Sequence, residues 1–167
     1  MNAPLPQRRP LRLSNFDYAD PHAYFVTIVV HDRRCILGEV VGGEVQLSLA
    51  GEMVAEEWRG LSARWPHLKV DPFVTMPNHL HGVLGTYNLK SPPALGAIVG
   101  AFKSITARAY RHGAKRGLWR NLPSGLWQRG FYDHVIRDPE DEARIIQYIT
   151  DNPARWEDDP ENPATPR

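Results

Sequence analysis

The sequence contains one cysteine, Cys35, among 167 residues. A single thiol cannot form an internal disulfide, and it cannot supply the cysteine clusters that bind structural zinc. No apolar run approaches the roughly 20 residues that a helix needs to span a bilayer. The N-terminal stretch is interrupted by prolines and lacks the apolar core of a secretion signal. These absences favour a cytoplasmic protein.

Acidic residues are missing between Ser91 and Gly130, a stretch that contains seven basic ones. The net charge of the whole chain is only +1 because acidic residues are concentrated after Thr150. A local basic run can bind polyanions even when the total charge is near zero. It predicts contacts with nucleic-acid phosphates, and the alternative is a solvated basic surface. The residues expected at the phosphates are Lys103, Arg108, Arg111, Arg120 and Arg129.

The composition predicts one globular domain with short, loosely held ends. Hydrophobic residues make up 42% of the chain and charged residues 23%, both ordinary values. Residues 1–17 form a Pro-rich and Arg-rich arm, which is either solvated or in contact with phosphates. Residues 18–156 form the domain, and the acidic, Pro-rich residues 157–167 form a tail that we expect to be frayed.

Alternating and helical hydrophobic patterns predict an α+β fold. Ser48 is expected to cap the first helix, and Asp138 with Pro139 to begin the last one. The expected order is a strand at 24–30, a hairpin at 40–45, a helix at 48–64, strands at 69–76 and 79–87, a helix at 91–111, a strand at 126–137 and a helix at 138–151. This order predicts a ferredoxin-like antiparallel sheet with helices on one side.

A His-x-His pair opens the strand expected at 79–87. Residues i and i+2 of a strand point to the same face. His79 and His81 therefore project side by side, while Leu80 points into apolar packing. Two imidazoles held in this way form half of a divalent metal site. The alternative is that one histidine packs and the other is solvated, since His-x-His alone is a weak signal.

A second cluster lies on the last expected helix. Tyr148 and Asn152 are four residues apart, so they share one helix face. Beside His79 and His81 they would give two imidazoles, an amide oxygen and a neighbouring phenol. Such a mixed nitrogen and oxygen set suits Mg²⁺ or Mn²⁺ engaged with a phosphate. The alternative is a tyrosine that packs at the helix end and an asparagine that caps it.

Three segments in this order resemble the single-tyrosine transposases of the HUH endonuclease superfamily, and most closely the REP-associated tyrosine transposases. They are Met76-Pro77-Asn78-His79-Leu80-His81, the run from Leu126 to Arg137, and Tyr148-Ile149-Thr150-Asp151-Asn152-Pro153. The resemblance covers roughly residues 18–156. It implies an α+β domain that binds single-stranded and hairpin DNA. It also implies His79, His81 and Asn152 as metal ligands and Tyr148 as the nucleophile, which forms a 5′-phosphotyrosine. A monomer is favoured, and the alternative is a dimer in which the tyrosine helix of one chain serves the metal of the other.

Other interpretations remain open at this point. Tyr132 is a second candidate nucleophile, although core packing is the role we expect for it, and a structural role is expected for His134. A non-cleaving hairpin-binding protein could keep the same residues. A metal-dependent phosphodiesterase that uses water could share the His-x-His pair. A covalent protein–DNA adduct would distinguish the transposase from both.

Overall fold

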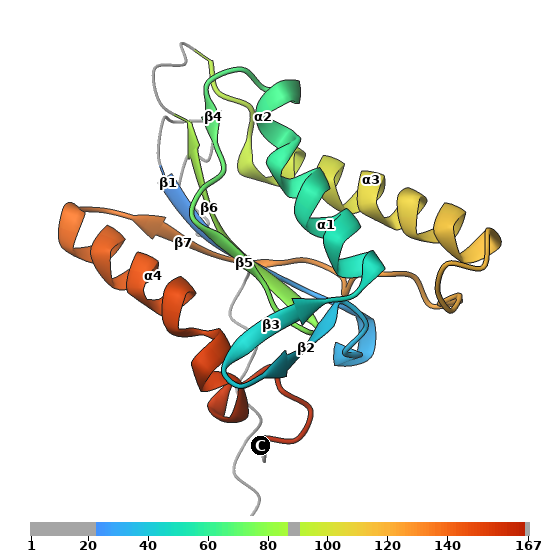
Figure 1. The fold of residues 1–167 in the computed structure, drawn as a ribbon. Helices are drawn as coiled ribbons and strands as arrows, with labels where there is room; N and C mark the ends of the chain where they lie inside the picture. Colours follow the sequence, from blue (N-terminus) through green and yellow to red (C-terminus); the bar gives the residue numbers. More distant parts are fainter. Residues whose placement is uncertain (1–22, 87–90, 166–167) are drawn as a thin grey trace, which may run out of the picture.

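The computed structural model describes residues 23–86 and 91–165, so the arm predicted at 1–17 lies outside the described residues. Five described strands form an antiparallel sheet in the order β4-β6-β1-β7, and β5 also pairs with β6 (Figure 1). The strands of this sheet are β1 (Ala23–Val29), β4 (Leu68–Lys69), β5 (Phe73–Thr75), β6 (His79–Thr86) and β7 (Tyr132–Ile136). The predicted α+β fold with an antiparallel sheet is confirmed.

The remaining elements follow the predicted order closely. Strands β2 (Gly38–Val41) and β3 (Glu44–Leu47) form the expected hairpin, which is a separate two-stranded sheet. The helices are α1 (Leu49–Arg59), α2 (Leu61–Arg64), α3 (Leu95–Lys115) and α4 (Pro139–Asp151), with the 3₁₀ helices η1 (His31–Arg33) and η2 (Pro153–Asp158). None of the helices in the described ranges has the length and apolarity needed to cross a bilayer.

Both expected N-caps are present. The side chain of Ser48 accepts a hydrogen bond from the Gly51 amide at 3.1 Å. That of Asp138 accepts one from the Asp141 amide at 2.8 Å. Each cap satisfies an amide that has no partner within its helix. The second long helix begins at Leu95 rather than at Ser91, and it extends beyond the predicted end to Lys115.

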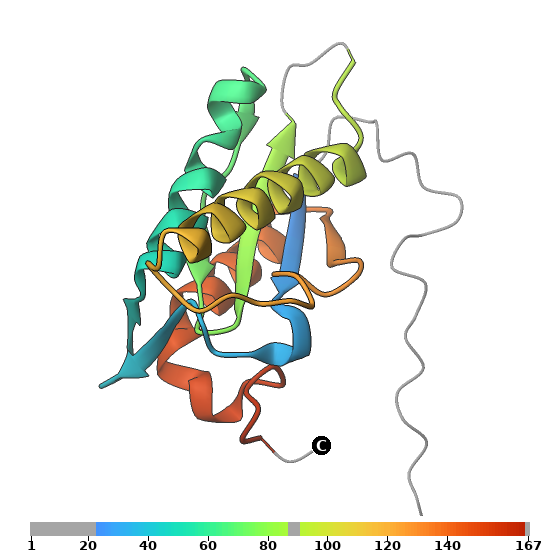
Figure 2. The same cartoon turned by 90° about the vertical axis from the view of Figure 1, so that its right-hand side faces the viewer.

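The expectation that the helices lie on one side of the sheet is wrong. Helices α1 and α3 cover one face, and α4 lies against the other face (Figures 1 and 2). Ile145 and Ile149 of α4 pack with Val83 of β6 in a cluster separate from the main core. The central strands are apolar on both faces, so each face needs a cover. This arrangement brings α4 to the face that carries the histidines.

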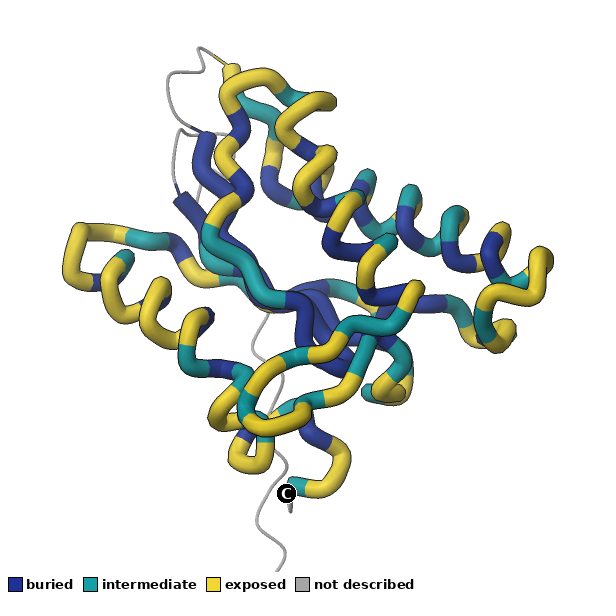
Figure 3. Tube along the Cα trace, in the orientation of Figure 1, coloured by how far each residue is buried: buried dark blue, intermediate teal, exposed yellow. Residues whose placement is uncertain are grey.

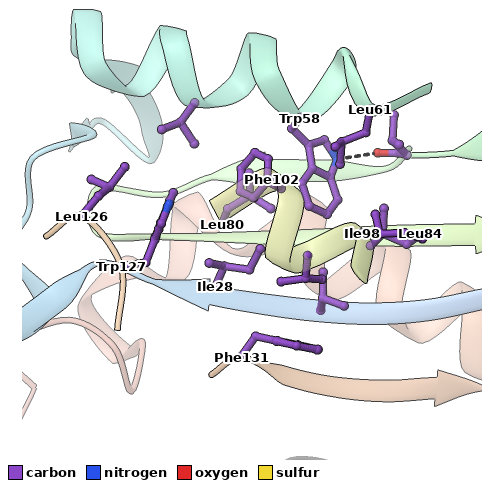
Figure 4. Packing of buried hydrophobic residues seen from close by; sticks show 14 of the residues in the cluster. Ile28, Trp58, Leu61, Leu80, Leu84, Ile98, Phe102, Leu126, Trp127 and Phe131 are labelled. Atoms are coloured by element: carbon purple, nitrogen blue, oxygen red, sulfur yellow. Dashed lines mark hydrogen bonds between the residues drawn. The ribbon is translucent and has the colours of Figure 1, made fainter. Parts of the chain in front are cut away.

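Strand alternation divides the side chains between the two faces. Leu80 and Leu84 of β6 belong to the main core with Phe102 and Trp58 (Figure 4). His79, His81 and Val83 point to the opposite face, as the period of two requires. Every residue of β6 is buried, which gives the histidine strand a fixed position in the middle of the molecule (Figure 3).

The expectation of a frayed tail after Trp156 is wrong for residues 157–165. Asp159 and Asn162 are buried at 4% and 7% exposure. The Asp159 carboxylate accepts a hydrogen bond from the Glu161 amide at 2.7 Å, and the Asn162 side chain accepts one from the Ala164 amide at 2.9 Å. The segment is therefore a series of ordered turns, each stabilised by an Asp or Asn side chain.

Gly82 permits the close contact between β6 and α1. A Cβ atom at Gly82 would overlap the indole ring of Trp58. That indole is anchored, because its Nε1–H donates to the Val70 carbonyl at 2.7 Å (Figure 4). We expect Gly82→Ala to lower the free energy of unfolding by about 1–3 kcal/mol through overpacking.

The matched control for this prediction is Gly100→Ala. Gly100 is exposed within α3 and has no heavy atom within 4 Å of an added Cβ. That substitution should raise the free energy of unfolding by roughly 0.5–1 kcal/mol. Urea denaturation measures both. Equal stability of the Gly82→Ala variant and the unmodified chain would show that β6 and α1 are less closely packed than described.

Candidate active site

The two histidines of β6 meet on the face that α4 covers. Their Nε2 atoms lie 3.0 Å apart, and the exposed fractions of His79 and His81 are 0% and 4%. The ring of Phe25, on β1, stacks against His81 with a centroid distance of 5.3 Å. The predicted side-by-side placement of the imidazoles is confirmed, and so is the inward direction of Leu80.

The hydrogen bonds of Asn78 determine the tautomer of His79. Its Nδ2 donates to the carbonyls of Arg33 and Glu161, at 2.9 and 2.7 Å. Its Oδ1 therefore faces Nδ1 of His79, 2.8 Å away, and accepts a hydrogen bond from that nitrogen. In the neutral ring, Nε2 of His79 then carries a lone pair directed at His81. A metal-binding histidine usually donates the N–H of its other ring nitrogen to an acceptor of this kind.

His81 is oriented in a similar way by β1. Its Nδ1 lies 2.7 Å from the hydroxyl of Thr27, which is its direct neighbour in the strand register. When Nε2 of His81 binds a cation, Nδ1 carries the proton and donates to this hydroxyl. Both rings are thus held by the nitrogen that faces away from the shared point.

Burial keeps both histidines neutral. It lowers the pKa of His79 to about 4, although the nearby Asp159 carboxylate and Asn152 amide act in the opposite direction. Burial and the neighbouring His79 also hold the pKa of His81 well below its ordinary value. A neutral imidazole is the form that binds a metal. The site therefore has its ligands in the required state at neutral pH.

Asp159, which the sequence analysis did not identify, completes the cluster. One of its carboxylate oxygens, Oδ2, lies 3.6 Å from Nε2 of His79. Ligand atoms of His79, His81 and Asp159 all lie within 4.8 Å of one another, and all three residues are buried. The dipeptides Asp159-Pro160 and Asn162-Pro163 are typical of turns. That signal could have indicated an ordered segment.

These residues fit a divalent cation. Among the described residues, Oδ2 of Asp159 is buried without a hydrogen-bond partner. A buried carboxylate oxygen beside two imidazole lone pairs is unfavourable unless a cation neutralises it. Two imidazoles, one carboxylate and a neighbouring amide form a mixed nitrogen and oxygen set. The structure thus supports a metal site, and Asp159 adds a charged ligand to those we expected.

The last turn of α4 brings Tyr148 and Asn152 to the histidines. The phenol oxygen of Tyr148 lies 3.4 Å from Nε2 of His81, and its ring contacts Phe25 edge to face at 5.8 Å. Burial raises the pKa of Tyr148, as do Asp159 and Glu161, while the Asn152 amide lowers it. The phenol is therefore protonated in the free protein.

Asn152 lies close to both His79 and Tyr148. Its amide is close enough to shift the pKa values of both His79 and Tyr148. Its Oδ1 is buried, and it accepts no hydrogen bond of regular geometry from the described residues. The helix spacing from Tyr148 to Asn152 has therefore brought the amide into the site, and its role as a ligand stays a prediction.

The two aromatic candidates of β7 have different surroundings from those of Tyr148. Tyr132 is 47% exposed, so the expectation that it packs in the core is wrong. Strand alternation explains this, because Phe131 and Val135 take the core positions on either side of it. His134 has the structural role we expected. Its Nε2 lies 2.7 Å from the carboxylate of Asp141 and ties β7 to the first turn of α4.

The residues predicted to contact phosphates lie on α3 and in the segment that follows α3. Lys103, Arg108 and Arg111 lie on α3, in the layer opposite the histidines. The ammonium of Lys103 donates to the carbonyls of Gln128 and Gly130 at 2.6 and 2.7 Å, so most of its hydrogen-bonding capacity is used within the protein. Arg108 and Arg111 are exposed, as are two further arginines outside α3, Arg120 and Arg129.

No family model matches the chain. An uncharacterized protein of Haemophilus influenzae is 33% identical over 172 residues, which cover 95% of this chain and 94% of the relative. A second Haemophilus influenzae protein, provisionally named as a REP-associated tyrosine transposase, is 50% identical over 32 residues. This match covers 19% of this chain and 18% of that protein.

Two solved structures share the fold. A REP-associated tyrosine transposase bound to a REP hairpin matches with a TM-score of 0.60 and 19% identity, over 87% of this chain and 74% of that one. A provisionally assigned transposase from Deinococcus radiodurans matches with a TM-score of 0.52 and 17% identity, over 83% of this chain and 96% of that one. The resemblance indicated by the three sequence segments is confirmed.

Removing the charge of Asp159 tests the metal site. Mn²⁺ at 100 times its Kd should stabilise the unmodified chain by about 2.7 kcal/mol and raise its Tm by roughly 5–10 °C. In Asp159→Asn the shift should largely disappear, because the amide keeps the hydrogen bond to the backbone and lacks the charge. His81→Ala should give the same result. Thermal denaturation with and without MnCl₂ measures the shift.

The matched control is Asp158→Asn, since Asp158 is the exposed neighbour of Asp159. Its Tm should respond to Mn²⁺ as that of the unmodified chain does. A full Mn²⁺ shift in both Asp159→Asn and His81→Ala would place the cation elsewhere.

Proposed function

Because this chain belongs to the same family as the Haemophilus influenzae relative and is related to the REP-associated tyrosine transposases, we propose that it cleaves and rejoins single-stranded DNA beside a hairpin. The proposed intermediate is a 5′-phosphotyrosine on Tyr148. One observation carries the proposal: the phenol oxygen of Tyr148 lies 3.4 Å from Nε2 of His81, within a buried cluster of potential metal ligands.

The ligands of a catalytic Mg²⁺ or Mn²⁺ would be His79, His81 and Asp159, with Asn152 beside them. When bound there, such a cation would neutralise charge on the phosphate of the DNA and help to hold it in place. Imidazole and carboxylate ligands fit Mn²⁺ well, and an all-oxygen set would suit Mg²⁺ better. The chain itself orients the rings through Asn78 and Thr27 and excludes water by burial.

The chemical step exchanges one phosphate ester for another. The phenol oxygen of Tyr148 attacks phosphorus, the new O–P bond forms, and the bond from phosphorus to the 3′ oxygen breaks. The proton lost by the phenol is balanced by the one gained by the 3′ oxygen. Because the ester energy is retained in the phosphotyrosine, a 3′-OH can reverse the step without ATP.

The fixed position of α4 supports Tyr148 over Tyr132 as the nucleophile. Ile145 and Ile149 hold the helix on the sheet, and the hydrogen bond between His134 and Asp141 holds its first turn. Tyr132 lies on β7, two strands from His81, which is roughly 10 Å across the sheet. Among the residues that the structure describes, Tyr148 is the tyrosine whose phenol reaches the ligand cluster.

The proposed partner is single-stranded or hairpin DNA, bound by a monomer in the cytoplasm. A structural neighbour is described as bound to a REP hairpin, which supports this partner. The contact between Tyr148 and His81 of one chain supports a monomer, since no second copy is needed to complete the site. The alternative is a hairpin-binding protein that no longer cuts.

Tyr148→Phe tests the nucleophile. It removes one oxygen and little apolar area, so the fold and hairpin affinity should persist. With Mn²⁺ and single-stranded DNA from the flanks of the gene, cleavage and the covalent adduct should both disappear. Mass spectrometry of the unmodified chain should find the DNA on the peptide that contains Tyr148.

Tyr132→Phe is the control for this prediction, because it removes the other candidate phenol on the same face of the sheet. That variant should still form the adduct. An adduct on Tyr132, or full cleavage by Tyr148→Phe, would refute the assignment. Hairpin binding without any adduct in the unmodified chain would favour the non-cleaving alternative.

Neutralising Arg108 and Arg111 tests whether the exposed arginines of α3 contact the DNA. Each lost contact with a single-stranded phosphate should flatten the slope of log affinity against log salt by about 0.7. The double glutamine variant should therefore lose about 1.4 from the slope. Lys103 is left intact because its ammonium supports the backbone.

The control for this prediction neutralises Arg59 and Arg64, two exposed arginines on α1 and α2, in the same way. An equal loss of slope in both double variants would show a nonspecific charge effect. An unchanged slope in the Arg108 and Arg111 variant would place the DNA elsewhere.

A further inference from the structure

A small hollow lies beside the histidine cluster, on the same face of the sheet. It is lined by residues of β1 and of the segment that leads into β7: Thr27, Val29, Gln128, Arg129, Gly130, Phe131 and Tyr132. The hydroxyl of Thr27 also contacts Nδ1 of His81 at 2.7 Å. The wall of the hollow is thus shared with the candidate metal site.

The strand register fixes the direction from the site to the hollow. Thr27 pairs with His81 on β6 and with Tyr132 on β7, so these three residues form one row across the sheet. Directly opposed residues in antiparallel strands point to the same face. The row therefore leads from the ligand cluster to the ring of Tyr132 over roughly two strand spacings, about 10 Å.

Hydrogen bonds hold the backbone that forms the rim of the hollow. The ammonium of Lys103 donates to the carbonyls of Gln128 and Gly130. The backbone N–H of Gln128 donates to the Val29 carbonyl at 2.8 Å. The φ of Gly130 is +77°, a conformation that favours glycine at this turn. A half-buried lysine thus fixes the backbone on both sides of Arg129.

The side chains on this rim are those that single-stranded nucleic acids contact. Tyr132 is 47% exposed on β7, the edge strand of the sheet that the described residues form, where charged residues and proline are the usual protection. The neighbouring guanidinium of Arg129 is exposed. Aromatic rings stack on bases of any sequence, and arginine adds contacts to phosphates and bases. The combination suits a ligand with both an aromatic ring and negative charge.

We propose that this hollow is a nucleotide subsite, in which Tyr132 stacks on a base of the single-stranded DNA close to the phosphate held at His79 and His81. Arg129 contacts a phosphate of the same nucleotide or of the next one. The subsite extends the proposed function, since it positions the strand that Tyr148 attacks. It holds the base at β7, on the sheet face that also carries His81.

The test measures binding without cleavage, in the full chain carrying Tyr148→Phe. Single-stranded DNA with its hairpin carries one 2-aminopurine, placed in turn at each unpaired position. We expect quenching on binding at one or two adjacent positions. Adding Tyr132→Ala should abolish that quenching and weaken the affinity roughly 5- to 150-fold, the range for loss of one stacked base. Adding Tyr132→Phe instead should keep the quenching.

Arg129→Gln should keep the quenching and flatten the salt slope by about 0.7. The matched controls are Leu49→Ala, which removes a side chain from a residue 59% exposed on α1, and Arg64→Gln. Leu49→Ala should leave the affinity and the quenching unchanged, and Arg64→Gln should leave the salt slope unchanged.

Unchanged affinity and quenching in the Tyr132→Ala variant would overturn the subsite, as would loss of affinity without any position-specific quenching. The result does not depend on cleavage. If the unmodified chain forms no adduct but quenching depends on Tyr132, the subsite holds and the proposed catalysis fails.

Discussion

The close approach of two imidazoles on a buried strand is the constraint on which the rest of the structure depends. Nε2 of His79 and Nε2 of His81 lie 3.0 Å apart, with no exposure of the first ring. Two lone pairs at that distance repel each other unless a cation or a proton lies between them. Without a metal, two neutral rings fit this distance when Nε2 of one donates a hydrogen bond to Nε2 of the other, whereas a bound cation would take up both lone pairs.

Several surrounding elements act on this pair. Strand β1 contributes Thr27 and Phe25, the turn before β6 contributes Asn78, and the C-terminal turns contribute Asp159. Helix α4 then covers the same face and brings Tyr148 within 3.4 Å. These parts come from distant positions in the sequence and converge on one buried polar cluster.

Much of this could be predicted from local patterns. The period of two placed His79 and His81 together and Leu80 in the core, and the caps at Ser48 and Asp138 began their helices as expected. These features depend only on neighbouring residues. The spacing from Tyr148 to Asn152 likewise predicted that both would reach one site, because a helix fixes that relation by itself.

Other features depend on tertiary packing and could not be predicted in this way. The apolar side of α4 shows that the helix packs on something, but it does not show which face of the sheet it covers. The acidic composition around Asp159 suggested disorder, whereas its Asp and Asn turns order the segment against His79. The exposure of Tyr132 could have been predicted, since strand alternation with the buried Phe131 already indicated that Tyr132 points away from the main core.

The central claim is that one chain carries a complete site, with α4 folded onto the histidines of the same chain. Mixing Tyr148→Phe chains with His81→Ala chains tests it most directly, in a cleavage assay with single-stranded hairpin DNA and Mn²⁺, with the unmodified chain as the active reference. Each variant alone lacks one essential group. The mixture should stay as inactive as either variant alone. Cleavage restored by mixing would show that the tyrosine of one chain serves the histidines of another, which contradicts this account.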